Sequence, residues 1–412
     1  MNLLLYSAYY EPEVAASLYL STNLYEDFAA SGMNTRLYVP LPTRGVSEEV
    51  RNQYKGKSEK KADGKLEIIR VNIPKEGRNA VKRAFRYLWM NLVFIHVSRK
   101  FDADAIFVQS TPPTQGAMAA IIKKRKKIPF IYNLQDVFPD SLVGSGMTSE
   151  GSVIYKIGRK IEDFTYKHAD RIIVISNDIK ANIQKKGVPE RKIVVVPNWI
   201  DFDAVHPVRK EENYLFDKYD IDREKFTVVY AGNLGYAQNI EVIIRAAEKL
   251  QDNDAIQFVL FGKGAQEEEY KELASGLKNL AFFPIQPYSE VSYVYSLGDV
   301  SIVPCKKGFG GSAMPSKTWS IMAAGTPVLA SFDRGTDLER LIKDENVGLF
   351  STADDVEGLV SNILALFNDA KIKEQMGANA RNYVKNNLSR EVCTKQYINV
   401  INSAVMRRKG NK

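Results

Sequence analysis

The sequence predicts an α/β protein with two doubly wound domains, and three observations lead to that prediction. The chain has 412 residues, which exceeds the usual length of one domain, about 100–150 residues. Short apolar runs of strand length alternate with longer segments of helical spacing in both halves. Two cysteines cannot build a disulfide framework, so the domains must be held together by hydrophobic cores between sheets and helices.

Six apolar runs in the first half are expected to form buried, mostly parallel strands. They are 2–7, 35–39, 105–109, 130–134, 171–175 and 192–196. The segment 17–31 has helical spacing and follows the first of these strands. The stretch 43–65 is polar and has no clear period, so it is predicted to be a loop.

The second half repeats this alternation. Its expected strands are 227–231, 257–261, 280–283, 300–303, 327–330 and 348–350, and its expected helices include 241–250, 315–324 and 356–368. The charged, aperiodic stretch 207–225 follows Pro197 to Asp201 and indicates a boundary near residue 200. We therefore expect a first domain over 1–200, a second over 201–390, and a C-terminal helix with a basic tail over 391–412.

The positive charge is concentrated in the first half. Residues 1–200 carry 31 Lys and Arg against 20 Asp and Glu, whereas residues 201–412 carry 26 against 29. Such an excess favours a polyanionic partner, either nucleic acid or the anionic face of a membrane. Nucleic acid is disfavoured because no zinc-finger, RNA-recognition or helix-turn-helix pattern is present. With no basic leader and no run of about 20 apolar residues, a cytoplasmic location is expected.

The densest basic segment spans residues 75–100 and has the pattern of an amphipathic helix. Lys82, Arg83 and Arg86 lie near its start, and Trp89 lies within it. The apolar stripe of this helix consists of Val81, Phe85, Leu88, Leu92 and Ile95. A basic helix with aromatic residues is typical of a segment at a membrane interface. The alternative is a domain helix whose stripe is core and whose basic face is solvated.

Glycine-rich turns follow three strands of the second half. In open α/β sheets such turns present backbone N–H groups to anionic ligands at the carboxyl ends of the strands. The candidate binding residues are Gly232, Asn233, Gly235 and Gln238 in the first turn, Gly262, Lys263 and Gly264 in the second, and Gly310, Gly311, Ser312, Pro315, Ser316 and Lys317 in the third. In the first half, Val14, Ala15, Ala16 and Ser17 follow the first strand in the same way. The third segment is expected to open a helix with Pro315 in its first turn and free N–H groups for an anion.

Several blocks, in order along the chain, resemble the family 4 glycosyltransferases of the GT-B fold. The blocks are Tyr10-Glu11-Pro12-Glu13, Asp136-Val137-Phe138-Pro139, 169–176, 196–201, 231–235 and 322–328. The similarity is greatest to the WbuB-like enzymes of bacterial O-antigen assembly. This resemblance implies two Rossmann-like domains facing across a cleft, with a nucleotide-diphosphate sugar held by the second domain and an acceptor held by the first.

The resemblance also implies particular substrates. These are UDP-linked N-acetyl-L-fucosamine as donor and a polyprenyl-diphosphate-linked saccharide as acceptor, met at the inner face of the cytoplasmic membrane. Four positions depart from the family pattern. Ser312 and Ser320 stand where two glutamates are usual, and Leu234 and Gln238 stand where an Arg and a Lys usually clamp the diphosphate.

We expect Lys317 and the backbone of 310–316 to stabilise the departing diphosphate, with Gly232–Gly235 and Gln238 on its other side. Gly262–Gly264 would contact the nucleoside, and Ser320 would lie near the donor sugar. Glu13, the turn 14–17 and Asp136 would line the acceptor side, with Asp136 as a base.

No metal or other cofactor is expected. Asp102 and Asp104 resemble the metal-binding carboxylate pair of the other main glycosyltransferase fold, but they precede a predicted strand instead of following one. The alternative function is that of a GT-B-fold sugar-nucleotide epimerase or hydrolase, which would need no membrane acceptor.

Overall fold

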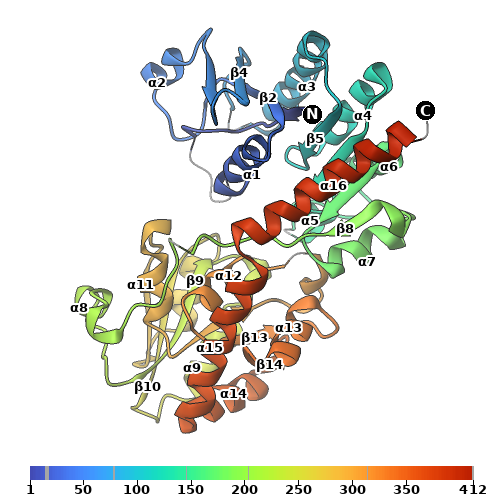
Figure 1. Cartoon of the computed structure of the whole chain (residues 1–412). Helices are drawn as coiled ribbons and strands as arrows, with labels where there is room; N and C mark the ends of the chain where they lie inside the picture. The colour runs from blue at the N-terminus through green and yellow to red at the C-terminus, as the bar shows by residue number, and fades with distance from the viewer. Residues whose placement is uncertain (14–17, 78, 145, 203, 313, 411–412) are drawn as a thin grey trace. The chain divides into compact units, whose positions relative to one another are not determined.

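A computed structural model describes residues 1–13, 18–77, 79–144, 146–202, 204–312 and 314–410 (Figure 1). The chain forms two compact units, Met1–Pro197 with Cys393–Lys412 and Asn198–Val392. The last helix, α16 (Arg390–Gly410), therefore belongs mainly to the first unit. Within that unit the Tyr397 ring packs edge-on against Phe107, with 6.2 Å between centroids. The sequence pattern did not indicate which unit this helix joins.

The first unit is built on an eight-stranded sheet in the order β3-β4-β2-β1-β5-β6-β7-β8. Its strands are β1 (Asn2–Tyr6), β2 (Asn34–Pro40), β3 (Ser58–Lys61), β4 (Leu66–Val71), β5 (Ala105–Gln109), β6 (Phe130–Leu134), β7 (Arg171–Val174) and β8 (Ile193–Val195). All pairings are parallel except that of β3 with β4. The six strands predicted for this half all form.

Helices flank this sheet. They are α1 (Leu18–Ala30), α2 (Glu48–Gln53), α3 (Ala80–Val97), α4 (Thr114–Lys126), α5 (Asp140–Gly144), α6 (Val153–His168) and α7 (Asn177–Lys185), with 3₁₀ turns at Ser98–Lys100 and Glu190–Lys192. The prediction of a loop over 43–65 was wrong, because this stretch contains α2 and β3. The β3 strand, Ser-Glu-Lys-Lys, is a polar edge strand and so lacks the apolar run that marks a buried strand.

The second unit contains a six-stranded parallel sheet in the order β11-β10-β9-β12-β13-β14. Its strands are β9 (Phe226–Asn233), β10 (Ile256–Lys263), β11 (Leu280–Pro284), β12 (Val300–Pro304), β13 (Val328–Phe332) and β14 (Gly348–Thr352). Its helices are α8 (Leu215–Lys218), α9 (Glu241–Lys249), α10 (Glu267–Leu273), α11 (Val291–Ser296), α12 (Lys317–Ala323), α13 (Asp337–Glu345), α14 (Val356–Asn368) and α15 (Ala370–Asn387), with 3₁₀ turns at Lys210–Glu212, Tyr236–Gln238, Tyr288–Glu290 and Gly310–Ser312.

Strand order in the second sheet reverses between β9 and β12. The chain moves outward from β9 through β10 to β11, then crosses to β12 on the other side of β9. At such a reversal the loops after the two central strands diverge and leave a crevice at their carboxyl ends. The prediction of an α/β, doubly wound architecture is confirmed in both units.

Each unit has its own hydrophobic core. Leu3, Leu4 and Leu5 in β1 are all fully buried, as expected for a parallel strand covered on both faces. Among the helices that the structure describes, none has the length and apolar character needed to cross a membrane.

Candidate functional site

The loops after β9 and β12 meet at the reversal of strand order in the second unit. The backbone N–H of Lys306 donates a hydrogen bond to the carbonyl of Ala237, at 3.0 Å. The Lys306 ammonium also lies 3.5 Å from the centroid of the Tyr236 ring, a distance suited to a cation–π interaction. These contacts join the two loops that border the crevice.

Lys317, the first residue of α12, lies against the end of β9. Its Nζ is 4.0 Å from the centroid of the Tyr230 ring. A Cβ atom on Gly232 would come within 2.7 Å of this Nζ, and Gly232 has a φ of +148°. Glycine is therefore favoured at 232 by the backbone, and a larger residue there would displace the ammonium.

The Lys317 ammonium makes no hydrogen bond or ion pair within the described part of the chain, although Lys317 is only partly exposed. Burial penalises the charged form and lowers the pKa of Lys317 to about 7. The nearby Tyr230 hydroxyl donates to the carbonyl of Asn233 at 2.6 Å. An anion beside Lys317 would favour its protonated form, so the arrangement suits an anionic ligand.

The structure brings three of the predicted donor residues together in the turn after β9. The Asn233 amide donates to Oε1 of Gln238 at 3.1 Å. A Cβ atom on Gly235 would come within 2.9 Å of both side chains. The next residue, Asn239, has a left-handed φ of 46° and donates to Asp354 at 2.6 Å. This turn is therefore held by side-chain amides.

Leu234 cannot take the place of a phosphate-binding arginine, because it is 1% exposed and belongs to the hydrophobic core. A Cβ atom on Gly262 would lie 2.6 Å from Leu234 Cγ, and one on Gly264 would lie 2.3 Å from the Leu234 carbonyl oxygen. These two glycines thus let the turn after β9 pack against the end of β10. Lys263, between them, is exposed.

The glycine-rich loop before α12 differs from the prediction in one respect. The N–H groups of Gly308 and Gly310 donate to the carboxylate of Asp333, which follows β13, at 2.8–3.0 Å. The prediction of a free N–H at Gly310 was therefore wrong, because an internal carboxylate already accepts from it. Gly311 is exposed, with nothing within 4 Å of its would-be Cβ.

The helix after this loop begins two residues later than predicted. It starts at Lys317 with Ser316 as its N-cap, so Pro315 lies outside it and the prediction of Pro315 in the first turn was wrong. Ser316 is exposed, and Ser320 lies three residues beyond Lys317 and is 7% exposed. The side chain of Ser312 lies outside the described part of the structure.

The first unit holds a pocket of about 490 Å³ at the carboxyl ends of β5 and β6. Its walls come from α3, the loop after β5, the loop after β6 and α6. Residues lining it include Arg83, Tyr87, Ser110, Thr111, Asp136 and Ile161. A pocket of this volume is large enough for a sugar-sized ligand.

Asp136 follows β6 and lines this pocket, as does Ser141. Burial raises the pKa of Asp136, while hydrogen bonds from the Ser141 hydroxyl and the Val137 N–H act in the opposite direction. A carboxylate with a raised pKa is better suited to accept a proton near neutral pH than an ordinary aspartate.

Glu13 does not line a binding surface, contrary to the prediction. It is 4% exposed, and its Oε1 accepts from the backbone N–H groups of Thr43 and Arg44 at 2.7 and 3.1 Å. Its Oε2 accepts from the Tyr10 N–H at 3.2 Å. The carboxylate therefore holds together the loops after β1 and β2. The other predicted acceptor-side residues, Val14, Ala15, Ala16 and Ser17, lie outside the described residues.

The structure separates the two interpretations of the α3 stripe. Phe85, Leu88 and Leu92 are 69%, 55% and 53% exposed, and Trp89 is 47% exposed, so the middle of the stripe faces solvent. The prediction that Arg86 faces a membrane was wrong. It is 2% exposed, and its Nε donates to the carbonyl of Pro74 at 2.8 Å.

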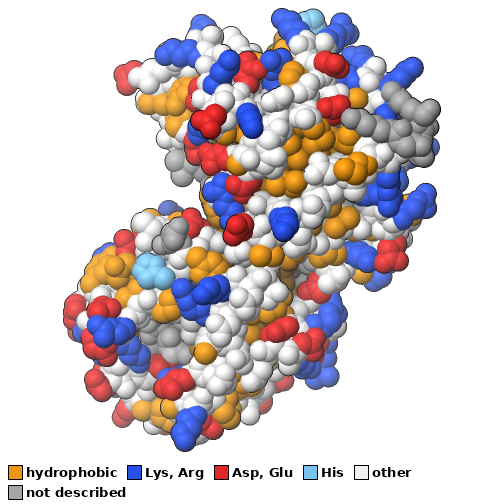
Figure 2. All heavy atoms as spheres, in the orientation of Figure 1, with side chains coloured by type: hydrophobic (Ala, Val, Ile, Leu, Met, Phe, Trp, Pro, Cys, Tyr) orange, Lys and Arg blue, Asp and Glu red, His pale blue; other side chains and the backbone are white. Residues whose placement is uncertain are grey.

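A second apolar surface, on α6, was not predicted from the sequence. Val153, Ile154 and Ile157 are 71%, 60% and 54% exposed. Ile161 of this helix lines the same pocket as Arg83 of α3, so the two surfaces belong to the helices that wall that pocket. In Figure 2, Lys and Arg side chains are spread over the visible face of the first unit.

Sequence reasoning missed three residues that shape these sites. Tyr230 lies within an apolar strand, which hides a ligand-side role, and Asp333 follows a strand with no motif around it. Tyr87 lines the first-unit pocket and donates to Glu76 at 3.1 Å. A tyrosine in a basic helix is the only signal that could have marked it. Among the described residues, no group of three or more His, Cys, Asp or Glu side chains is placed to hold a metal ion.

Two families match consecutive parts of the chain. The glycosyl transferase 4-like domain matches residues 20–199, and the family of glycosyl transferases group 1 matches residues 211–383. The chain is a glycosyltransferase with the GT-B fold. The first match covers most of the unit with the Asp136 pocket, and the second covers most of the unit with Lys317.

Three individual proteins illustrate the relationship. The putative colanic acid biosynthesis glycosyl transferase WcaI of Escherichia coli K12 is 24% identical over 414 residues, covering 97% of this chain and all of the relative. The probable glycosyltransferase WbjE of Pseudomonas aeruginosa is 28% identical over 61% of this chain and 63% of its own length. The structure of Anabaena Alr3699/HepE in complex with UDP aligns with a TM-score of 0.71 at 13% identity, covering 98% of this chain and 100% of that one.

These relatives favour sugar transfer over the alternative of an epimerase or hydrolase. Both sequence relatives are named as glycosyltransferases. The glycosyltransferase is thus an enzyme whose second unit reverses its strand order between β9 and β12, the position at which open α/β sheets bind ligands.

Proposed function

We propose that this glycosyltransferase moves a sugar from a UDP-linked donor, bound by the second unit, onto a polyprenyl-diphosphate-linked saccharide bound by the first unit. The product would enter polysaccharide biosynthesis, as the name of the relative WcaI suggests. The observation that carries this proposal is the ammonium of Lys317, which lies against the end of β9 and has no hydrogen-bond or ion-pair partner among the described residues.

The donor diphosphate gains negative charge as its bond to the sugar breaks. Lys317 would supply the compensating positive charge, and Gly232 leaves the space for its ammonium. A charge held in place before the reaction stabilises the transition state without reorganisation. Asn233 and Gln238, in the adjoining turn, would contact the same donor. This arrangement takes over the role of the Arg and Lys that Leu234 and Gln238 replace.

The acceptor side is supported by the pocket around Asp136. The carboxylate would accept the proton of the acceptor hydroxyl as the hydroxyl attacks the sugar. Arg83, on the α3 wall of the pocket, would pair with a phosphate oxygen of the acceptor, because a guanidinium can donate two parallel hydrogen bonds to phosphate.

A lipid-linked acceptor has to be met at a membrane surface, and α3 and α6 suit such a contact. Both helices line the pocket, and both carry exposed apolar side chains. Lys82 and Arg83 on α3, and Lys156 and Lys160 on α6, are also exposed. Apolar insertion combined with basic side chains is how peripheral segments bind the anionic inner leaflet. We therefore propose that the first unit docks on this leaflet.

The proposal is tested by mass spectrometry of the products formed from a panel of UDP-sugars and a lipid-diphosphate-GlcNAc acceptor. Transfer of one sugar to the lipid, with release of UDP, is expected, and UDP-N-acetyl-L-fucosamine is the first donor to test. Release of free sugar, or interconversion of the UDP-sugar without an acceptor, would instead identify a hydrolase or an epimerase.

Activity is expected to survive chelation by EDTA, because Lys317 would supply the positive charge that a divalent cation supplies in other glycosyltransferases. Initial rates with and without 5 mM EDTA, in metal-free buffer, should agree within about twofold. Loss of activity that Mg²⁺ or Mn²⁺ restores would contradict the Lys317 mechanism. It would favour metal binding by Asp102 and Asp104.

Leu88→Ser/Leu92→Ser is expected to release the protein from vesicles containing phosphatidylglycerol. Each burial of a leucine side chain in the interface contributes about 1.5–3 kcal/mol, so co-sedimentation at low salt should fall at least tenfold. Turnover of a water-soluble, short-chain acceptor should stay within about twofold of wild type.

The matched control is Ile285→Ser/Ile372→Ser, which removes two apolar side chains of similar exposure, 51% and 48%, from the second unit. It should bind vesicles like the wild type. If both double variants co-sediment equally well, the α3 surface does not dock on membranes.

A further inference from the structure

A second, smaller pocket lies in the first unit at the opposite end of its strands from Asp136. It has a volume of about 220 Å³ and is lined by Pro129, Asp170, Arg171, Ala404, Arg407 and Arg408. Pro129 precedes β6 and Arg171 begins β7, whereas Asp136 follows the far end of β6. A five-residue strand spans about 16 Å, so this pocket is separate from the proposed acceptor site.

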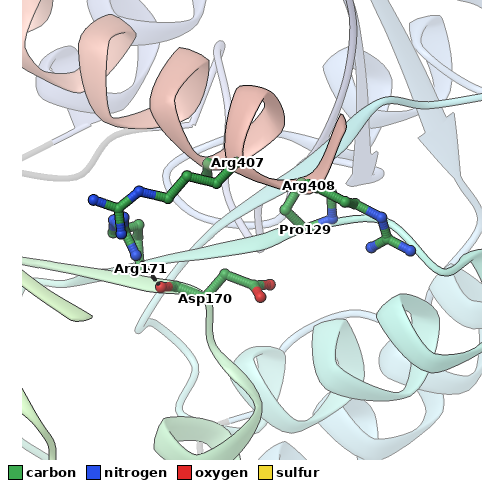
Figure 3. Close-up of a pocket in the computed structure, with 6 residues that line it drawn as sticks. Pro129, Asp170, Arg171, Arg407 and Arg408 are labelled. Carbon is green, nitrogen blue, oxygen red and sulfur yellow. Dashed lines mark hydrogen bonds between the residues drawn. The ribbon is translucent and has the colours of Figure 1, made fainter. Parts of the chain in front are cut away.

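Three arginines and a single carboxylate line this pocket. Figure 3 shows Arg407 reaching from α16 toward Arg171, and Arg408 of the same helix on the other side of the space above Asp170. The only hydrogen bond of Arg171 in the described structure runs from Nη1 to the carbonyl oxygen of Asp170, at 2.9 Å. Within the described residues, none of the three guanidinium groups forms an ion pair with a carboxylate.

The carboxylate of Asp170 is already compensated by other groups. Its Oδ2 accepts from the Lys123 ammonium at 2.7 Å and from the Phe130 N–H at 2.8 Å. Lys123 belongs to the basic run 123–127, and it adds another positive charge near the N-terminal ends of β6 and β7. Asp170 therefore cannot neutralise the three arginines as well.

Like charges held together without counter-charge repel each other. Burial lowers the pKa of Arg171, and the positive charge of Arg407 lowers it further, while the negative charge of Asp170 acts in the opposite direction. Packing α16 against the N-terminal ends of β6 and β7 thus creates a local excess of positive charge. An anion between the guanidinium groups would relieve the repulsion and would accept several charge-assisted hydrogen bonds.

We propose that this pocket binds a phosphate-bearing anion. The anion would bridge the end of α16 to the N-terminal ends of β6 and β7. The volume admits a phosphate or diphosphate group but is below the range of about 300–1,000 Å³ that suits whole drug-sized ligands. The phosphate could be a free anion or the headgroup of a phospholipid, since both offer the same oxygens to arginine.

Thermal unfolding in inorganic phosphate, with ionic strength held constant by chloride, tests the site. Phosphate should raise the melting temperature of the wild type by about 3 °C or more at saturating concentration. The same rise is expected in Lys317→Ala, whose proposed donor site is disabled. It should be lost in Arg407→Gln/Arg408→Gln and retained in Arg99→Gln/Lys100→Gln, which removes two exposed charges from the same unit.

Stability without phosphate separates ligand binding from a structural role. Because Arg407→Gln/Arg408→Gln removes repulsion, it should melt no lower than the wild type in phosphate-free buffer. An equal phosphate-induced shift in this variant and the wild type would overturn the proposal. So would a lower melting temperature of the variant without phosphate, which would show that the arginines serve packing.

Vesicles distinguish the two sources of phosphate. If the ligand is a lipid headgroup, binding to phosphatidic acid vesicles should weaken at least tenfold in Arg407→Gln/Arg408→Gln. If it is a free anion, this variant should lose the phosphate-induced thermal shift and still bind the vesicles as the wild type does.

Discussion

Replacing Lys317 with alanine is expected to lower kcat/KM at least 100-fold without unfolding the protein. The reason is the position of the ammonium, which lies over Tyr230 and beside Gly232 and has no carboxylate partner in the described structure. Losing one electrostatic donor to a developing oxyanion typically costs about 2.7–4 kcal/mol of transition-state stabilisation. Steady-state kinetics with a saturating acceptor would measure the loss.

The pH dependence of UDP binding gives an independent check on Lys317. In the free protein its pKa is about 7, so above pH 7 the anion must bind together with a proton. Affinity should fall by up to tenfold per pH unit between pH 7.5 and 8.5. Calorimetry in buffers of different ionisation enthalpy should detect proton uptake by the wild type and none by Lys317→Ala.

The stability of this variant should move in the opposite direction from its activity. The pKa of Lys317 is lower in the folded state than its ordinary value of 10.5. The resulting penalty is therefore fully present below pH 7 and is relieved as the pH rises toward 10.5. Lys317→Ala should thus melt no lower than the wild type at pH 6.5. Lys278→Ala, which removes an exposed lysine from the same unit, is the matched control. Less than a tenfold loss of kcat/KM in Lys317→Ala would exclude Lys317 as the phosphate ligand.

Asp136→Asn is expected to lower kcat by about 10²–10⁴-fold, the range for loss of a general base. The amide keeps the shape and the hydrogen-bond acceptor of Asp136 but cannot take a proton at neutral pH. Because burial raises the pKa of Asp136, its charged form is disfavoured in the folded state. Removing the charge should leave the melting temperature at pH 7 unchanged or higher.

The pH profile distinguishes a base from a residue that only shapes the pocket. Wild-type kcat should fall as the pH drops through the raised pKa of Asp136, and Asp136→Asn should lose this acidic limb. Asp102→Asn makes the same change at a carboxylate that does not line the pocket and should leave both rate and profile intact. A wild-type profile retained in Asp136→Asn would assign the proton transfer to another group.

Most strands of both sheets could be predicted from the sequence because their signal is local, although both β3 and β4 were missed. A strand buried on both faces has to be a short apolar run, whatever its neighbours are. The edge strand β3 escaped prediction because an edge needs no apolar run. Positions such as Gly232 and Lys317 could be proposed as ligands because a glycine-rich turn after a parallel strand is also a local pattern.

Other features depend on which residues meet in three dimensions. Glu13 and Gly310 resembled ligand-binding residues, but their polar groups are used by Thr43 and Asp333, which are distant in the sequence. Helical periodicity identified the stripe on α3 but could not tell whether it faces the core or the solvent, because that depends on how the helix lies on its sheet.

The sequence by itself thus determined the strand and helix alternation, the separation of positive charge into the first half, and the glycine-rich turns that bring Lys317 to a strand end. The tertiary structure decided that Arg86 is buried while Leu88 is exposed, and that α16 carries Arg407 to Arg171. The physical reason is that burial and the pairing of charges arise from contacts between segments far apart in the chain, and such contacts leave no periodic trace in either segment alone.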